Sequence, residues 1–256
     1  MFVDSHCHLD RLKLNESELD NAVNEATLAG VEHMLCVAVS VKEYEQMFDK
    51  VKHFKNVSVS CGVHPLHQED ASTANELLRV CSRDEVVAVG ETGLDYYYSE
   101  DTKAIQLTSF VDHIKTANLL KKPLIIHTRS AQEDTLSLLN AHYERSTGAV
   151  LHCFTESLEM AQAAIEMGIY ISISGIVTFN SAKELQQTVK KIPLDKLLIE
   201  TDSPWLAPVP HRGKENQPKH VVDVAKFIAE LKGVPLTQLA EQTSHNFYTL
   251  FDRVKS

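Results

Sequence analysis

Short apolar, β-branched runs alternate along the chain with longer segments in which apolar residues recur at helical spacing. The short runs predict eight strands, at Phe2–Ser5, His33–Ser40, Val57–Gly62, Val86–Gly90, Leu124–His127, Ala149–His152, Ile169–Ser174 and Leu197–Thr201. The longer segments predict helices, including Glu16–Ala29, Asp101–Leu120, Leu158–Met167, Ala182–Lys190, Val221–Lys232 and Leu236–Phe251. Strands separated by helices pair in parallel, so the pattern indicates repeated strand–helix units.

Eight such units predict an α/β fold, a single-domain (β/α)₈ TIM barrel that spans residues 1–256. The length is close to the roughly 250 residues typical of this barrel. No Gly/Ser-rich linker or change of composition divides the chain, and 43% hydrophobic with 23% charged residues is an ordinary globular composition. We therefore expect one domain.

Polar residues interrupt the apolar pattern at the ends of six predicted strands. A histidine or an acid stands at or just after the carboxyl end of each, namely His6 with His8, His64, Glu91, His127, His152 and Asp202. The carboxyl ends of barrel strands meet at one face, where barrel enzymes place their chemistry. One such histidine is more often structural, but burying so many unpaired titratable groups together would be costly. The pattern therefore predicts a functional site at this face.

The spacing of His6 and His8 suits a shared metal ion, because residues two apart in a strand project to the same side. Cys7 points the other way and is expected to pack. Imidazole and carboxylate ligands suit Zn²⁺ or Mn²⁺, and Mg²⁺ is acceptable where carboxylates and water carry more of the coordination. These strand ends offer more ligands than a single catalytic zinc needs, so we expect two divalent ions. A single ion, with some of the histidines binding substrate, stays open as the alternative.

Six segments carry a family resemblance: SHCHLD at 5–10, GVHP at 62–65, GETGLDYY at 90–97, IHTR at 126–129, HCF at 152–154 and ETDSPWLAPVPHRGKENQP at 200–218. Together they resemble the TatD family of metal-dependent deoxyribonucleases, which belongs to the amidohydrolase-like barrels. The match covers nearly the whole chain in order. It implies the metal ligands His6, His8, Glu91, His127, His152 and Asp202. Trp205 departs from a common Tyr, and Glu215 stands in an otherwise basic loop, which weakens the case for that loop as a phosphate clamp.

Two carboxylates are the expected catalytic residues. Glu91 can bridge two ions through its two oxygens, and Asp202 is the expected proton-transfer group. One ion is expected on His6, His8, Glu91 and Asp202, and the other on His127, His152 and the shared Glu91. Asp4 and Glu200 lie one layer deeper, where they either orient ligand histidines or serve as structural polar residues.

The expected reaction is hydrolysis of phosphodiester bonds in nucleic acid, by a deoxyribonuclease that acts as an exonuclease on single-stranded DNA or DNA ends. His64, Arg129 and Arg212 are the expected substrate contacts. Tyr96 and Tyr97 either stack on a base or pack within their own loop. The net charge of −10 disfavours coating of duplex DNA, although metal ions in a cleft attract phosphates locally.

Three other functions use the same residues. The metal site could serve a small-molecule amidohydrolase, or an esterase that removes a misattached amino acid from tRNA, an aminoacyl-tRNA deacylase. A metal-binding scaffold without catalysis is the third alternative, which the presence of every expected ligand disfavours. Assays against a panel of substrates separate these functions from the nuclease.

The sequence also favours a cytoplasmic protein with no membrane segment. Its first residues show no basic region followed by an apolar run, and apolar runs stay well short of the ~18 residues that a spanning helix requires. Five scattered cysteines, with no CxxC pair, are typical of reduced and mostly buried thiols.

Overall fold

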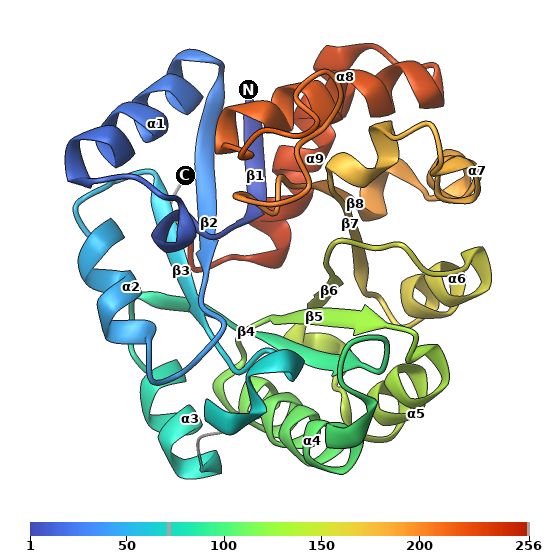
Figure 1. The fold of residues 1–256 in the computed structure, drawn as a ribbon. Helices are drawn as coiled ribbons and strands as arrows, with labels where there is room; N and C mark the ends of the chain where they lie inside the picture. The colour runs from blue at the N-terminus through green and yellow to red at the C-terminus, as the bar shows by residue number, and fades with distance from the viewer. Residues whose placement is uncertain (71–72, 255–256) are drawn as a thin grey trace.

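The computed structural model describes residues 1–70 and 73–254, within which eight parallel strands form one sheet in the order β1 to β8. The strands are β1 (Phe2–Cys7), β2 (Val31–Val37), β3 (Val57–Cys61), β4 (Val86–Asp95), β5 (Leu124–Arg129), β6 (Ala149–Leu151), β7 (Tyr170–Ile173) and β8 (Leu197–Ile199). The sheet curls into a nearly closed barrel with helices around it (Figure 1). The predicted (β/α)₈ barrel is confirmed, and each predicted strand overlaps an observed one.

Most of the helices connect successive strands around the outside of the barrel, and the last two follow β8 (Figure 1). They are α1 (Glu16–Leu28), α2 (Tyr44–Val51), α3 (Ala74–Cys81), α4 (Lys103–Leu120), α5 (Gln132–His142), α6 (Leu158–Glu166), α7 (Lys183–Lys191), α8 (Val221–Lys232) and α9 (Leu236–Leu250). Two helix starts are fixed by reciprocal capping hydrogen bonds, from Asn15 for α1 and from Thr73 for α3.

The barrel closes between β1 and the segment that follows β8. The Asp202 N–H donates to the His6 carbonyl over 2.9 Å, and the His8 N–H donates to the Ser203 carbonyl over 2.7 Å. These two bonds join the end of β1 to the segment that follows β8. They hold two polar strand ends side by side at the C-terminal face.

Asp4 joins the same two segments, β1 and the residues after β8, one layer deeper in the barrel. Its buried carboxylate accepts hydrogen bonds from the Thr201 N–H at 2.8 Å and from the Thr201 hydroxyl at 2.5 Å. Burial raises the pKa of Asp4 to about 8. Asp4 therefore links β1 to the segment that follows β8.

Apolar side chains fill the barrel and seal its N-terminal end. The interior cluster joins strand residues to the last helix, and includes Val3, Leu35, Val37, Val87, Ile125, Val150 and Leu198 with Phe247 and Phe251. Asn246 of α9 donates to the carbonyl of Leu197, the first residue of β8, over 2.8 Å. Because α9 occupies this end, the polar site lies at the opposite, C-terminal end.

The cysteines are mostly buried, as expected. All five cysteines are free, and Cys7 is buried with its thiol 3.4 Å from the Leu35 carbonyl. Across residues 1–70 and 73–254, none of the helices combines the length and the hydrophobicity needed to cross a bilayer.

Candidate metal centre

β1 brings His6 and His8 to one side of the strand, as their spacing predicts. Their Nε2 atoms lie 3.1 Å apart, and both rings are buried. Asp202 places Oδ1 3.4 Å from His8 Nε2 and 3.8 Å from His6 Nε2. Glu91 Oε2 lies 3.4 Å from His6 Nε2 and 3.8 Å from His8 Nε2. The imidazoles of His6 and His8 and the carboxylate of Asp202 thus gather near Glu91 Oε2.

The other oxygen of Glu91 faces three further histidines. Oε1 lies 2.6 Å from His152 Nε2, 3.3 Å from His64 Nε2 and 3.3 Å from His127 Nδ1. Glu91 is only 2% exposed, so its charge is neutralised by these neighbours and not by water. The carboxylate divides the surrounding ligand atoms into two sets.

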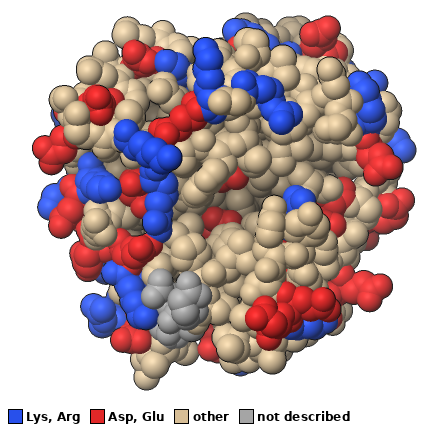
Figure 2. Space-filling model, viewed as in Figure 1, with Lys and Arg blue, Asp and Glu red and all other residues tan. Residues whose placement is uncertain are grey.

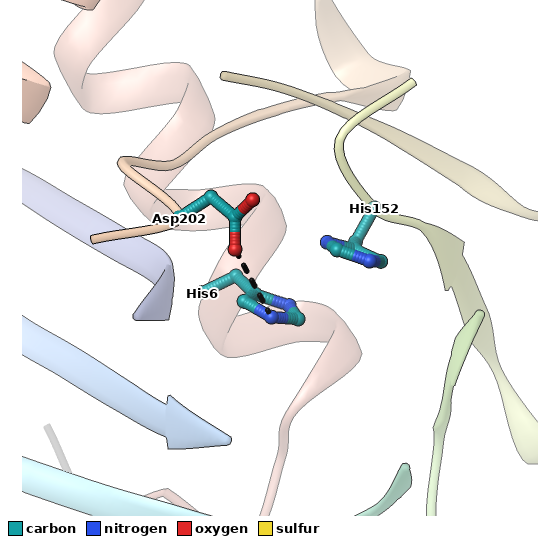
Figure 3. Close-up of side chains that lie close together, drawn as sticks. All are labelled: His6, His152 and Asp202. Atoms are coloured by element: carbon teal, nitrogen blue, oxygen red, sulfur yellow. Dashed lines mark ion pairs between the residues drawn. The ribbon is translucent and has the colours of Figure 1, made fainter. Parts of the chain in front are cut away.

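The grouping of these residues differs in part from the expected one. Figure 3 shows His6 and Asp202 directed toward one another, with the His152 ring beside them. The rings of His6 and His152 stack with centroids 3.9 Å apart and 11° between their planes. Ligand atoms lie within 4.8 Å of one another in three groups: His6, His152 and Asp202; His6, His8 and Glu91; and His64, Glu91 and His127. His152 thus reaches both sets, and His64 joins the set in which His152 was expected.

Two buried carboxylates orient the rings of His127 and His152. Asp95 Oδ2 lies 3.0 Å from His127 Nε2, and Glu200 Oε1 lies 3.3 Å from His152 Nδ1. Each carboxylate holds a proton on the outer nitrogen, so the inner nitrogen presents a lone pair to the centre. Glu200 has the orienting contact that the sequence allowed. Asp95 was missed because the predicted strand ended at Gly90, whereas β4 continues to Asp95.

Backbone groups fix the proton on two other rings, with opposite results. His8 Nδ1 lies 2.8 Å from the Val37 carbonyl, which only accepts, so His8 Nε2 keeps its lone pair toward the centre. The Leu66 N–H instead donates to His64 Nδ1 over 3.0 Å. Burial lowers the pKa of His64 to about 4, so the ring is neutral and carries its proton on Nε2, the atom that faces Glu91. His64 therefore offers the site a hydrogen-bond donor, and the other rings offer ligand atoms.

The donor set fits divalent cations. With its proton held on Nδ1 by Glu200, His152 Nε2 turns a lone pair toward Glu91 Oε1, an acceptor only 2.6 Å away. Leaving such an acceptor unsatisfied is costly, and a cation between it and the carboxylates would remove that cost. Burial raises the pKa of Glu91, but the histidines around it together outweigh burial and hold that pKa well below its usual range. Neutral imidazoles beside ionised carboxylates are the ligands of Zn²⁺ and Mn²⁺.

A cavity of about 440 Å³ opens over the centre. Figure 2 shows the hollow in this face, with acidic side chains at its floor and Lys and Arg side chains along part of its rim. Arg129 lines the cavity and holds its guanidinium 4.9 Å from the centroid of the Tyr97 ring. Arg212 is exposed outside the lining, 3.7 Å above the centroid of the Phe179 ring. Of the two expected arginine contacts, only Arg129 thus faces the cavity.

Residues 3–252 match the family model described as TatD related DNase. The chain belongs to the TatD family of metal-dependent hydrolases. This TatD-family member is 49% identical over 251 residues to the metal-dependent hydrolase YcfH of Escherichia coli, covering 97% of this chain and 95% of YcfH. It is 35% identical over 239 residues to the Escherichia fergusonii protein named 3'-5' ssDNA/RNA exonuclease TatD, covering 91% of this chain and 92% of that protein.

A solved structure shows the same fold. The crystal structure of YJJV, a TatD homologue from Escherichia coli, superposes on this TatD-family member with a TM-score of 0.92 and 28% sequence identity, covering 98% of each chain. The predicted family and the predicted barrel are therefore confirmed. The structure brings the six expected ligands together, but their roles as ligands and catalysts stay predictions.

Proposed function

We propose that this TatD-family protein hydrolyses phosphodiester bonds at the ends of single-stranded DNA with two divalent metal ions. The observation that carries the proposal is the division of the centre by Glu91, whose two oxygens face different imidazoles. The family model describes DNases, and the Escherichia fergusonii relative is named an exonuclease on single-stranded DNA and RNA. Those names support a nucleic-acid substrate and attack from a strand end.

The position of the ring proton separates the histidines that would bind a metal ion from the histidine that would bind the substrate. One ion would be held by His6, His8, Asp202 and Glu91 Oε2, and the other by His127, His152 and Glu91 Oε1. His64 is assigned to the substrate, because its inner nitrogen carries a proton and cannot bind a cation. In this assignment Glu91 contributes one oxygen to each ion.

The residues of the chain then have distinct tasks at the reacting phosphate. Bound ions would polarise a phosphoryl oxygen, activate water near neutral pH and stabilise the leaving oxygen. Burial raises the pKa of Asp202, but the His8 hydrogen bond and the neighbouring histidines together lower it, so Asp202 is ionised and accepts the proton of the attacking water. His64 donates its Nε2 proton in a hydrogen bond to a phosphate oxygen, and Arg129 pairs with the charge of the same strand. Attack forms one P–O bond and breaks another.

The cavity supports attack on an unpaired strand end. Its volume of about 440 Å³ is of the size that holds a small ligand, and the polar residues lie at its floor. In this proposal a base-paired end separates before one of its strands reaches that floor. A single nucleotide at the end of one strand is the fitting occupant.

The test is a substrate panel with metal-reconstituted protein. Chain reloaded with Mn²⁺, Zn²⁺ or Mg²⁺ is assayed against end-labelled single-stranded DNA, duplex DNA, RNA and aminoacylated tRNA. We expect stepwise shortening of single-stranded DNA, near two ions per chain by elemental analysis, and no shortening by Asp202→Asn. One ion at full activity would refute the binuclear centre. Release of the amino acid with DNA left intact would replace the nuclease by the deacylase.

A further inference from the structure

Trp205 is the only tryptophan of the chain, and it lines the cavity while 49% of it is exposed. Its ring stands edge-on to His8, with centroids 5.1 Å apart and an interplanar angle of 67°. A large aromatic surface left in water is a source of binding free energy when a flat apolar group covers it. Trp205 therefore offers a stacking surface directly beside the metal centre.

The backbone around Trp205 is fixed on both sides. The Trp205 N–H donates to the Asp202 carbonyl over 3.0 Å. Its carbonyl accepts a hydrogen bond from Asn216 Nδ2 over 2.7 Å, and the same amide group donates to the Thr201 carbonyl over 2.9 Å. Asn216 is fully buried. The exposed ring is thus presented by a held loop, so little ordering is needed when a ligand stacks on it.

Tyr98 adds a second exposed aromatic ring to the lining of the same cavity. It is 68% exposed, and its N–H donates to Asp95 Oδ1 over 2.9 Å. The other oxygen of Asp95 holds His127. Aromatic rings anchored to residues of the metal centre therefore line a cavity whose floor is charged, an arrangement that suits a molecule with a flat apolar part and an anionic part.

We propose that Trp205 stacks on the base of the nucleotide whose phosphate enters the metal centre, and so selects strand ends that carry an unpaired base. The inference rests on the proposed function and names the part of the substrate that is recognised. Every base has a π-face, so this contact tolerates all sequences. A base held in a duplex is already stacked on its neighbour and gains less from the ring, which favours unpaired ends.

Kinetics with matched strands test the stacking. Two single-stranded oligonucleotides differ only in the nucleotide at the attacked end, which is ordinary in one and abasic in the other. For the wild type we expect the abasic end to raise KM by about 5- to 150-fold, the range for stacking one base, with kcat changed less than about threefold. Trp205→Leu keeps an apolar side chain but should bring the ratio of the two KM values, abasic over ordinary, close to one. Trp205→Phe should keep most of the wild-type ratio.

Val209→Ala is the matched control, because Val209 lies in the same loop and is also 49% exposed but does not line the cavity. It should keep the wild-type ratio. A Trp205→Leu variant that distinguishes the two strands as well as the wild type would overturn the inference.

Fluorescence separates base binding from cleavage. Because Trp205 is the only tryptophan, its emission in the metal-loaded protein reports contact with an added ligand. We expect quenching by deoxyadenosine monophosphate and little change with deoxyribose 5-phosphate. Base-dependent quenching without cleavage of any strand would defeat the proposed function and leave the stacking intact. Equal quenching by both compounds would defeat the stacking even if DNA is cleaved.

Discussion

Glu91 is the residue on which the two-ion arrangement depends. Its Oε2 lies 3.4 Å from His6 Nε2, and its Oε1 lies 2.6 Å from His152 Nε2. Glu91→Gln keeps the size of the side chain but removes the charge that would neutralise both ions. We expect kcat to fall at least ~10²-fold, a loss of several kcal/mol of transition-state stabilisation, together with a lower metal content. Kinetics and elemental analysis check this, and circular dichroism should show an intact fold. Near-normal turnover would contradict the bridging role.

The two arginines expected to bind substrate differ in their position relative to the cavity. Arg129 lines the cavity, whereas Arg212 lies outside it against Phe179. We expect Arg129→Ala to raise KM for a short oligonucleotide about tenfold or more, as removal of a hydrogen bond to a charged group does, and Arg212→Ala to have the smaller effect. Arg129→Lys should restore only part of the loss, because an ammonium cannot make a bidentate contact. Measurements of KM at two salt concentrations decide it, and a larger effect at Arg212 would reverse the ranking.

At the scale of single residues, the positions of the site residues were predictable and their protonation was not. Alternation along a strand places His6 and His8 on one side, and strand ends converge in any barrel. The proton on His64 depends on the Leu66 N–H, a contact of the local loop geometry that no spacing encodes. The stacking of His6 on His152 likewise depends on how two strands far apart in sequence are juxtaposed.

At the scale of elements, β4 matters most, because it carries both Glu91 and Asp95 past the point where apolar alternation stops. Gly93 makes this extension possible. Its φ is +135°, and a Cβ built on it would lie 2.0 Å from the His127 carbonyl oxygen of β5. Only glycine allows the two strands to approach this closely.

We therefore expect Gly93→Ala to be strongly destabilising and to displace His127. Gly213 provides the control, because it also has a positive φ, +81°, but its Cβ would meet nothing within 4 Å. Gly213→Ala should cost about 1–3 kcal/mol from backbone strain alone, and Gly93→Ala should cost more. Urea unfolding of both variants measures the difference. Equal losses would show that the close approach of β4 to β5 is relieved easily.

Element boundaries show where sequence patterns stop being informative. Apolar periodicity predicts α8 to the residue, at Val221–Lys232. The last strand was predicted to reach Thr201 but ends at Ile199, because the Thr201 N–H bonds to the Asp4 side chain and not to a neighbouring strand. β-propensity cannot anticipate that a buried carboxylate replaces a ladder partner.

At the scale of the whole molecule, the two ends of the barrel carry opposite kinds of packing. Phe247 of α9 and Phe251, which directly follows that helix, fill the N-terminal end, while buried carboxylates and imidazoles occupy the C-terminal end. The count of strands predicts the barrel, and the polar strand ends predict which end is functional. The amphipathic pattern of α9 predicts a helix but not its position. That α9 covers the N-terminal end of the barrel follows from tertiary packing.

Stability of the whole barrel should depend on pH through buried histidines that are not part of the metal centre. His113 of α4 is 2% exposed, accepts a hydrogen bond from the Val63 N–H on Nε2 at 2.9 Å, and lies with Nδ1 2.7 Å from the Ser109 carbonyl. Burial lowers its pKa from 6.5 to about 4, and burial does the same for His33 of β2. Both rings are thus neutral in the fold at neutral pH.

The sign of the effect follows from proton uptake. Below pH 6.5 the unfolded chain protonates His113, while the folded chain takes up the proton only near pH 4. The contribution of His113 is therefore complete above pH 6.5 and is lost as the pH falls toward 4. At about 1.4 kcal/mol for each pKa unit, about 2 kcal/mol is lost by pH 5.

His113→Gln tests this, because glutamine retains an acceptor for the Val63 N–H but does not titrate. Its free energy of unfolding should be lower than that of the wild type at pH 7.5 and should fall about 2 kcal/mol less between pH 7.5 and pH 5. The two proteins share every other histidine, so the contributions of the metal centre and of His33 cancel in the comparison. Urea unfolding at both pH values measures the four free energies. Equal decreases in the free energy of unfolding of the two proteins would contradict the prediction. They would mean that His113 takes up its proton at the same pH in the folded and unfolded chains, and that acid instability arises elsewhere in the barrel.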